Sequence, residues 1–274
     1  MHKPQLLVSF CISWLLLTCA SSLGQQINDA ILFHATFDAS HDATLAKGDS
    51  QIYTAESMKR EKTKPGLHTD AVEWRRTGGR KGGALFFTKK SKQLVYFEAN
   101  RNVPFDKAKF RGTVSFWMQL SPKEDLPEGF VDPLQITDKK WNDASFFVDF
   151  DKEKEREFRL GAFSDHAFWN PDKRNFDNIP RKERPMVFVK DWPFTRKTWT
   201  HVAFTWDAFN TGKEAAAELF LNGESRGKLT RKQQFTWDPS KAVIMLGINY
   251  VGGLDDLAIF DRALSAEEIK QIAK

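Results

Sequence analysis

The sequence predicts an all-β sandwich that ends in a short helix. Between Gly112 and Leu120, apolar side chains alternate with mostly polar ones, which is the period of a strand with one buried face. Short apolar runs separated by turn residues recur along much of the chain. With 274 residues and 41% apolar content, the chain can bury one large core, and sandwiches of this size often form a single domain.

The last stretch, residues 252–273, carries the clearest local signals. A short apolar run at 254–260 predicts a strand, and a helix is expected to follow at once. Ser265 is a good N-cap, and Glu268 three residues later completes a capping box. Leu264 and Ile269 occupy the two positions of a hydrophobic staple. Because only a few residues join strand to helix, we expect the helix to pack on the end of the sheet that holds the strand.

Further strands are expected from apolar alternation and turn signals. They are placed at 30–37, around 51–55, and at 84–87, 93–97, 112–120, 144–150, 158–163, 186–190, 199–206, 214–221, 225–229 and 242–247. Propensity alone would make 214–221 (EAAAELFL) helical, since alanine and glutamate are strong helix formers. Asn222-Gly223 follows directly, however, and is a type I′ hairpin signal, so a strand is predicted there.

Several of these segments resemble a known family. Residues 253–269 read GLDDLAIFDRALSAEEI, 199–203 read WTHVA, and 113–117 read TVSFW. These motifs are similar to those of laminin-G-like domains of the concanavalin A-like lectin/glucanase superfamily, and the match at 253–269 is specific. The resemblance implies an antiparallel jelly-roll β-sandwich whose first and last strands are neighbours. It also supports a strand at 214–221.

The first 24 residues are expected to be a signal peptide. Lys3 precedes an apolar run at 6–17, and the small residues Ser22 and Gly24 stand at plausible cleavage positions. A membrane anchor is the alternative, although the run is short for a bilayer span. The mature chain, 25–274, is therefore expected to be one domain that is secreted, periplasmic or on the cell surface, with no membrane span after cleavage.

Cysteine content and charge exclude several function classes. Cys11 and Cys19 both lie in the expected leader, so no disulfide, catalytic thiol or cysteine-ligated zinc is expected in the mature chain. The formal net charge is only +5, and the basic residues are interspersed with acids. Nucleic-acid binding would usually need a basic stripe, so nucleic acid is not an expected partner.

Residues 122–193 depart from a minimal domain, and we interpret them as an insertion that bears the binding face. An exposed indole beside carboxylate and amide groups suits sugar binding, because the ring covers an apolar sugar face while the polar groups bind hydroxyls. The candidate ligand-binding residues are Asp165, His166, Trp169, Asn170 and Trp192. The alternative is that these aromatic side chains pin long loops onto the sandwich.

A calcium site is a second hypothesis, and it depends on the family resemblance. Many relatives of this fold hold calcium near the junction of the first and last strands, and calcium prefers several oxygen ligands. Asp38 ends the first expected strand, while Asp255 and Asp256 lie at the start of the last. If these strands are neighbours, the three carboxylates approach one another and could hold a structural Ca²⁺. The alternative is that each aspartate accepts hydrogen bonds from turn amides.

No motif for catalysis is recognisable in the chain. The Glu-x-Asp-x-x-Glu pattern of sandwich glycosidases is absent, and so are the Gly-x-Ser-x-Gly and His-Glu-x-x-His motifs. His201 lies within a family motif, and we interpret it as structural. We therefore expect a non-catalytic binding module for carbohydrate, such as a cell-surface glycan. A polysaccharide hydrolase or lyase with its site in 122–193 is one alternative, and a protein-binding adhesive or structural domain is another.

Overall fold

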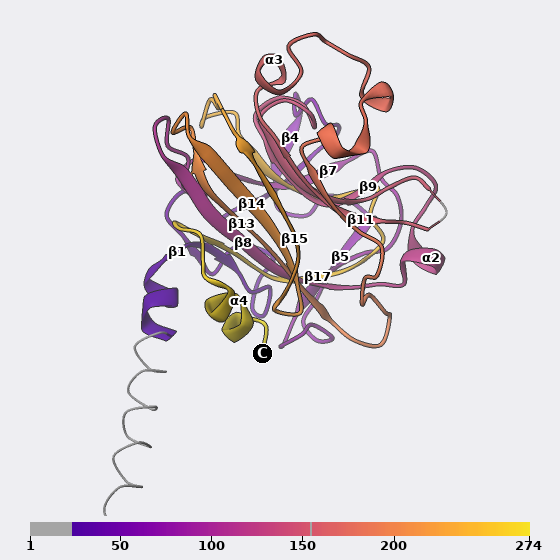
Figure 1. The fold of residues 1–274 in the computed structure, drawn as a ribbon. Helices are drawn as coiled ribbons and strands as arrows, with labels where there is room; N and C mark the ends of the chain where they lie inside the picture. Colours follow the sequence, from indigo (N-terminus) through magenta and orange to yellow (C-terminus); the bar gives the residue numbers. More distant parts are fainter. Residues whose placement is uncertain (1–23, 154) are drawn as a thin grey trace, which may run out of the picture.

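The computed structural model describes residues 24–153 and 155–274, and within them two antiparallel sheets pack face to face (Figure 1). The all-β prediction is confirmed. The expected leader, apart from Gly24, and both cysteines lie outside the described residues. No helix in the described part of the chain is long and apolar enough to cross a membrane.

The first sheet has nine strands and contains the chain's first and last strands. Its main path runs β15-β14-β13-β8-β17-β1-β2, and β6 pairs with β17 and with β5. The bounds are β1 Ile31–Ala35, β2 Leu45–Ala46, β5 Val72–Arg75, β6 Ala84–Phe87, β8 Phe110–Gln119, β13 Thr200–Phe209, β14 Glu214–Leu221, β15 Glu224–Lys232 and β17 Gly252–Phe260.

The second sheet has eight strands in the order β12-β11-β10-β9-β16-β7-β3-β4. Their bounds are β3 Ile52–Ala55, β4 Thr63–Pro65, β7 Leu94–Glu98, β9 Val131–Thr137, β10 Ser145–Phe150, β11 Phe158–Phe163, β12 Met186–Val189 and β16 Val243–Ile248. Residues 122–193 supply four of these strands. They also form the short helices α2 Pro122–Asp125, α3 His166–Trp169, η1 Phe176–Asn178 and η2 Arg181–Glu183.

The two ends of the described chain meet in the first sheet. β1 and β17 are antiparallel neighbours, with Phe33 opposite Ile259 and Ala35 opposite Leu257. The adjacency implied by the family resemblance is therefore present. β1 pairs with residues 257–260 of β17, and β6 pairs with residues 252–254 at the start of that strand.

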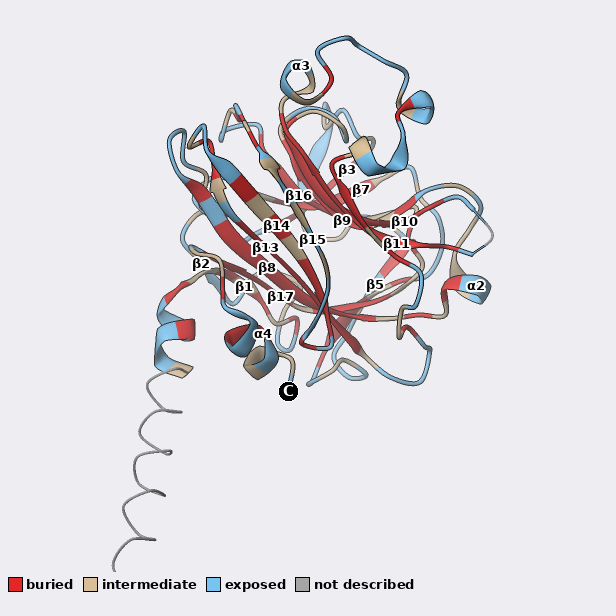
Figure 2. Ribbon diagram, viewed as in Figure 1, coloured by how far each residue is buried: buried red, intermediate tan, exposed pale blue. Residues whose placement is uncertain are grey.

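The core lies between the sheets, where one face of each strand is apolar and buried (Figure 2). In β8, Val114, Phe116 and Met118 point inward as the alternation predicted. The centre is aromatic: the Phe146 ring stacks on Phe235 at 4.8 Å between centroids. Because so much apolar area is removed from water here, this layer supplies most of the driving force for folding.

The C-terminal helix α4, Ala266–Ile272, has the cap that the sequence predicted. The Glu268 backbone N–H donates to Ser265 Oγ at 3.2 Å, and the Ser265 N–H donates to Glu268 Oε2 at 2.8 Å. Leu264 and Ile269 are buried together with Phe220. The helix thus lies against the outer face of the first sheet, covering apolar side chains that β14 and β17 present there.

Two segments show how sheet context decides secondary structure. Residues 214–221 form β14 as predicted, because Ala215, Ala217 and Leu219 alternate into the core. Strand β9 was not predicted from the sequence. Its Pro133 argues against a central strand, since proline lacks the backbone donor that a ladder needs. Leu134 and Ile136 nevertheless pack in the core, and a register shift interrupts the β9–β10 ladder between Val148 and Phe150.

Candidate binding cleft

A cleft of about 580 Å³ lies on the outer face of the second sheet. Its floor is a row of side chains that face away from the core on adjacent strands. Strand register places Met245 of β16 opposite Gln135 of β9, Gln135 opposite Phe147 of β10, and Phe147 opposite Gly161 of β11. Their chain neighbours point the other way into the core, so the period of two in each strand builds the floor.

A glycine lets the Phe147 ring lie over the neighbouring strand. A Cβ at position 161 would stand 2.3 Å from a Phe147 ring atom, far inside van der Waals contact. The ring also stacks on Phe163, with centroids 5.5 Å apart. Gly161 therefore keeps an aromatic surface level with the floor of the cleft.

Exposed apolar side chains gather around this cleft. Trp141 is 42% exposed, Phe130 is 45% exposed and Met58 is 47% exposed, and all three line the cleft. The only other exposed large apolar residues among those described are Leu45 and Phe168. Clustered exposed apolar groups mark interaction sites more often than scattered ones do.

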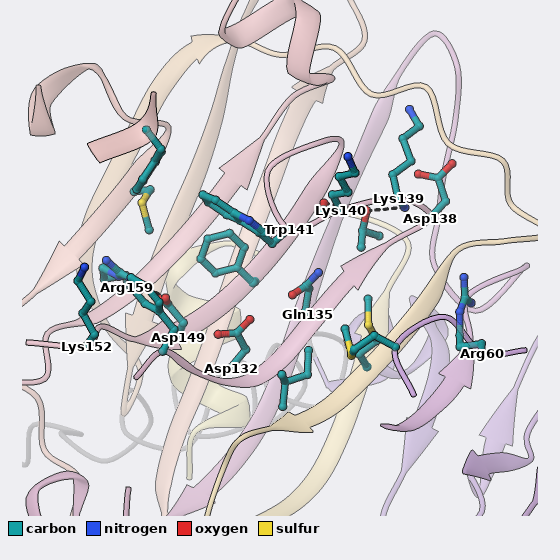
Figure 3. Close-up of a pocket in the computed structure, with 18 of the residues that line it drawn as sticks. Arg60, Asp132, Gln135, Asp138, Lys139, Lys140, Trp141, Asp149, Lys152 and Arg159 are labelled. Carbon is teal, nitrogen blue, oxygen red and sulfur yellow. Dashed lines mark hydrogen bonds and ion pairs between the residues drawn. The ribbon is translucent and has the colours of Figure 1, made fainter. Parts of the chain in front are cut away.

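Trp141 stands above the middle of the floor (Figure 3). It comes from the loop between β9 and β10, and its ring makes edge contacts with Phe163 at 5.5 Å and with Phe176 at 5.1 Å. These contacts support one part of the indole while the remainder faces solvent. A supported but exposed ring can be covered by a ligand at little cost in side-chain entropy.

The floor also holds a buried ion pair. Arg159 Nε donates to Asp149 Oδ1 at 2.8 Å, and a second guanidinium nitrogen donates to Asp149 Oδ2. Burial raises the pKa of Asp149, and the hydrogen bonds from Arg159 oppose that shift. Beside them, burial and then the Asp149 charge raise the pKa of Asp132 well above its usual range. The Arg159 guanidinium lies 5.2 Å from the Phe130 ring centroid, in cation–π range.

Cations stand at both ends of the cleft (Figure 3). At one end, Lys139 Nζ lies 3.2 Å from Asp165 Oδ1 and 3.0 Å from the Thr236 carbonyl oxygen. Lys140 at that end and Lys152 at the other are exposed, and neither forms an ion pair with any residue that the structure describes. The rim thus offers positive charges that are not neutralised within the chain.

None of the residues nominated from the sequence lines the cleft. The Trp169 indole N–H donates to the Asn142 carbonyl oxygen at 2.9 Å, and its ring contacts Phe163. Asn170 is buried and donates to the Arg174 carbonyl oxygen. His166 is half-buried beneath Trp169, at 5.6 Å between ring centroids.

Asp165 and Trp192 also serve the surrounding loops. The Thr236 hydroxyl donates to Asp165 Oδ1 at 2.9 Å, tying α3 to the segment before β16. The Trp192 indole N–H donates to the Arg156 carbonyl oxygen at 2.9 Å, and its ring packs against the core. These contacts are those of the loop-pinning alternative. They do not measure ligand binding, so the nomination stays a prediction.

The structure shows what surrounds the three candidate calcium ligands. Asp38 Oδ1 accepts the Gly83 N–H at 3.2 Å, and Asp255 Oδ2 accepts the Arg80 N–H at 2.6 Å. Asp38 and Asp255 therefore bind opposite ends of one loop, in which the Gly79 N–H donates to the Gly82 carbonyl oxygen. Asp256 instead points at His34, with Oδ1 and Nε2 2.6 Å apart.

One carboxylate oxygen in this region lacks a partner. Asp255 Oδ1 is buried without a hydrogen bond, and burial raises the pKa of Asp255 to about 7. A cation beside Asp38 and Asp255 would satisfy that oxygen, with loop carbonyls as further ligands. No cluster of three or more His, Cys, Asp or Glu side chains in metal-binding arrangement occurs among residues 24–153 and 155–274. Asp38 and Asp255 share the loop of residues 79–83, whereas Asp256 is turned toward His34.

His201 has the features of a structural histidine. Its Nε2 lies 2.8 Å from Ser115 Oγ, its Nδ1 has no hydrogen-bond partner, and its ring is tilted against the Trp117 ring, with centroids 5.1 Å apart. Burial lowers the pKa of His201 to about 4, so the imidazole is neutral at pH 7. Both side chains of this Ser–His pair are buried, which closes it to a substrate.

The cleft residues were largely missed at the level of sequence. Gln135, Phe147, Arg159 and Met245 sit inside strands, where nothing in their local pattern separates a cleft floor from an ordinary solvent face. Trp141 gave the one usable signal, an aromatic residue in a loop rich in lysine and aspartate. That pattern does not show that Trp141 is more exposed in the folded chain than Trp169.

The fold is similar to solved toxin binding domains. The botulinum neurotoxin serotype D ligand binding domain in complex with N-acetylneuraminic acid has 14% identity and a TM-score of 0.57, over 92% of this chain and 52% of that one. The binding domain of Paraclostridial Mosquitocidal Protein 1 has 13% identity and a TM-score of 0.56, over 90% and 52%. The botulinum neurotoxin type G receptor binding domain has 11% identity and a TM-score of 0.54, over 89% and 50%.

The chain spans about half the length of each of these structures, and at such low identity the likeness concerns the fold. No protein with a curated description matches the chain in sequence. A family model described as Concanavalin A-like lectin/glucanases superfamily matches residues 91–270. With its sandwich, its adjacent terminal strands and this match, the chain belongs to the concanavalin A-like lectin/glucanases superfamily.

Proposed function

We propose that the protein is an exported, non-catalytic binding module for glycans and that its ligand occupies the cleft on the second sheet. The observation that carries this proposal is the half-exposed Trp141 ring above an apolar floor. Apolar rings cover the C–H faces of a sugar, while groups such as the Gln135 amide bind its hydroxyls. The toxin binding domains of similar fold are consistent with a binding role.

The test is binding of Trp141→Ala to a glycan array, followed by titration calorimetry with the glycans retained by the wild type. Central aromatic contacts often contribute 2 kcal/mol or more to binding, so the loss should be roughly 30-fold. Phe168→Ala is the matched control, because Phe168 is 47% exposed but lies outside the cleft. Unchanged affinity in Trp141→Ala, with the fold intact by circular dichroism, would rule out this cleft.

The residues nominated from sequence enter the same experiment. Trp169→Ala should leave glycan affinity within about twofold if the indole only pins its loop to the Asn142 carbonyl. A larger loss in Trp169→Ala than in Trp141→Ala would move the binding surface to Asp165, His166 and Asn170. A glycan array that retains nothing, together with specific capture of a surface protein, would favour the protein-binding alternative.

Polysaccharide cleavage is the second candidate, and Asp132 is the observation that favours it. A carboxyl with a raised pKa beside a second carboxyl can act as a general acid. Burial and the Asp149 charge raise the pKa of Asp132 well above its usual range, and both side chains line the cleft. Incubation with a polysaccharide panel distinguishes the two functions. Release of new reducing ends by the wild type but not by Asp132→Asn would establish cleavage, whereas retention without release supports a binding module.

We also propose a structural calcium ion between Asp38, Asp255 and the loop of residues 79–83. Support comes from the buried, unpartnered Asp255 Oδ1. The loop amides that Asp38 and Asp255 bind with their other oxygens match the alternative, in which turn amides satisfy these carboxylates. Calcium that binds only the folded state must raise the melting temperature. A rise of several degrees in excess CaCl₂ that EDTA reverses, and that Asp255→Asn abolishes, is expected. An unchanged melting temperature would remove the ion from the proposal.

Export is the remaining part of the proposal, and it depends on the leader expected at residues 1–24. Expression of the full chain with a C-terminal tag should yield a mature protein outside the cytoplasm that begins near Gln25. Intact-mass measurement of the recovered protein gives the cleavage site. A full-length product confined to the cytoplasmic fraction would contradict it.

A further inference from the structure

We propose that the glycan bound in this cleft is acidic and that it carries carboxylate or sulfate groups. This inference rests on the proposed glycan-binding function and specifies the ligand class of the same cleft. The observations that carry it are the placement of the unpaired cations and the engagement of two of the cleft's four carboxylates by groups of the protein itself.

The unpaired lysines stand at opposite ends of the cleft. Lys140 follows the end of β9 and Lys152 follows the end of β10, and the two strands are antiparallel neighbours. The end of β10 therefore lies beside the start of β9, with Phe150 opposite Val131. Since β9 has 7 residues, the two basic ends are separated by about 20 Å. Figure 3 shows them on opposite sides of Trp141.

A third cation faces the cleft from a different element. Arg60, in the turn between β3 and β4, donates to the Lys241 carbonyl oxygen at 2.9 Å, and its guanidinium lies 5.8 Å from the Tyr96 ring centroid. These contacts hold the charge near the β16 side without neutralising it. Lys140, Lys152 and Arg60 thus border the cleft on separate sides.

Three of the four carboxylates that line the cleft are buried or half-buried, and two of these accept hydrogen bonds from the protein itself. Asp149 is engaged by Arg159, and Asp138 Oδ2 accepts the Asp238 N–H at 2.8 Å. Asp138 Oδ1 is buried without a hydrogen-bond partner. Asp132 is half-buried against the same floor, and Asp177 is the one exposed acid among the described residues that line the cleft. A ligand entering the cleft therefore meets mainly positive charge around an aromatic centre.

An acidic glycan matches both parts of this surface. Its ring faces can lie on Trp141 and Phe147, while acid groups along the chain reach Lys140 at one end and Lys152 at the other. Attraction between solvent-exposed charges is screened by salt, so binding should weaken as ionic strength rises. A neutral glycan could accept hydrogen bonds from the lysines but would not neutralise their charge.

The experiment measures binding by calorimetry to four probes at low and high salt. Alginate tests carboxylate groups, heparin tests sulfate groups, carboxyl-reduced alginate is the neutral match for the first, and single-stranded DNA tests non-sugar polyanions. We expect at least one acidic glycan to bind about tenfold or more tightly than carboxyl-reduced alginate and DNA, with affinity falling between 50 mM and 500 mM NaCl.

The variants separate the cleft from the overall positive charge. Lys140→Gln with Lys152→Gln should weaken binding of the acidic glycan about 5- to 10-fold, because each exposed ionic contact contributes little alone. The matched control is Lys109→Gln with Lys213→Gln, two exposed lysines outside the cleft that border strands of the first sheet. The control should bind like the wild type.

Three outcomes would overturn the inference. The first is that carboxyl-reduced alginate binds as tightly as alginate and heparin and that this binding is lost in Trp141→Ala. Such a result would keep the glycan cleft but remove its preference for acidic glycans. The second is equal weakening by both lysine pairs, or DNA bound as well as the glycans, which would show attraction to overall charge. The third is no binding to any glycan probe or to the array, which would reject the proposed function itself.

Discussion

Replacing Arg159 by methionine tests the buried ion pair that supports the cleft floor. The side chains of Arg159 and Asp149 are 8% and 4% exposed, so removing the guanidinium leaves a carboxylate in a site with little access to water. Breaking one side of a buried ion pair typically costs about 3–5 kcal/mol of folding free energy. Methionine keeps much of the arginine stem's volume, so the change acts chiefly on charge.

Protonation of Asp149 limits how large that loss can become. The unfolded carboxyl has a pKa of about 3.9, and holding it protonated at pH 7 costs about 4 kcal/mol at 1.36 kcal/mol per unit. At pH 5 the same cost is about 1.5 kcal/mol. In Arg159→Met, the pKa of Asp149 in the folded chain lies above its pKa in the unfolded chain. The cost of Asp149 to the free energy of unfolding is therefore absent below about pH 4 and grows as the pH rises.

The assay is urea unfolding followed by tryptophan fluorescence at pH 5 and pH 7. We expect Arg159→Met to lower the free energy of unfolding by about 3–4 kcal/mol at pH 7. The loss at pH 5 should be smaller than the loss at pH 7 by about 2 kcal/mol. Arg174→Met is the control, because Arg174 pairs with Glu183 at the surface and should contribute less than about 1 kcal/mol. A loss below about 1 kcal/mol in Arg159→Met, or one that does not change with pH, would refute this reasoning.

Four further changes have defined outcomes. His201 has a pKa lowered to about 4, so the free energy of unfolding should decrease as the pH drops from about 6.5 to 4. In urea titrations, this decrease should be smaller in His201→Gln than in the wild type, by up to about 3 kcal/mol. Asp255 has a pKa raised to about 7, so its cost to the free energy of unfolding grows between about pH 4 and 7 and is constant above that. Asp255→Asn in EDTA should therefore gain stability as the pH rises from about 4 to 7, and a gain already present at pH 4 would contradict this. Ser265→Ala should lower the free energy of unfolding by about 1 kcal/mol, and no change would mean that the capping box of α4 is not stabilising. Gly161→Ala should cost about 1–3 kcal/mol because its Cβ collides with Phe147, and wild-type stability would show that the ring can move freely.

The expected strands were accurate where local pattern and packing agree. The alternation between Gly112 and Leu120 matches β8, since a side-chain period of two is also the geometry that buries one face. The strand at 214–221 could be predicted against its helix propensity because Asn222-Gly223 dictates a tight hairpin. Strand β9 was missed for the converse reason, because Pro133 is a local signal that core packing overrides.

The cleft shows the limit of such reasoning. Trp141 and Trp169 both lie in polar loops, yet Trp141 stands over the cleft while the Trp169 indole N–H bonds to the Asn142 carbonyl. Nothing local distinguishes the two, because their exposure depends on which strand ends lie beneath them. The same holds for Asp38 and Asp255, which meet one loop only after β1 and β17 have paired.

Sequence alone therefore determined the elements of this protein: the alternating strands, the hairpin at Asn222-Gly223, the capped final helix and the family motifs. These are short-range properties, set by side-chain period, turn conformation and cap hydrogen bonds between residues a few positions apart. The tertiary structure decided the cleft, because strand register brings Met245 beside Gln135 and Gln135 beside Phe147 from distant parts of the chain. It also decided the pKa shifts of Asp132, His201 and Asp255, since the burial that causes them exists only once the two sheets have packed.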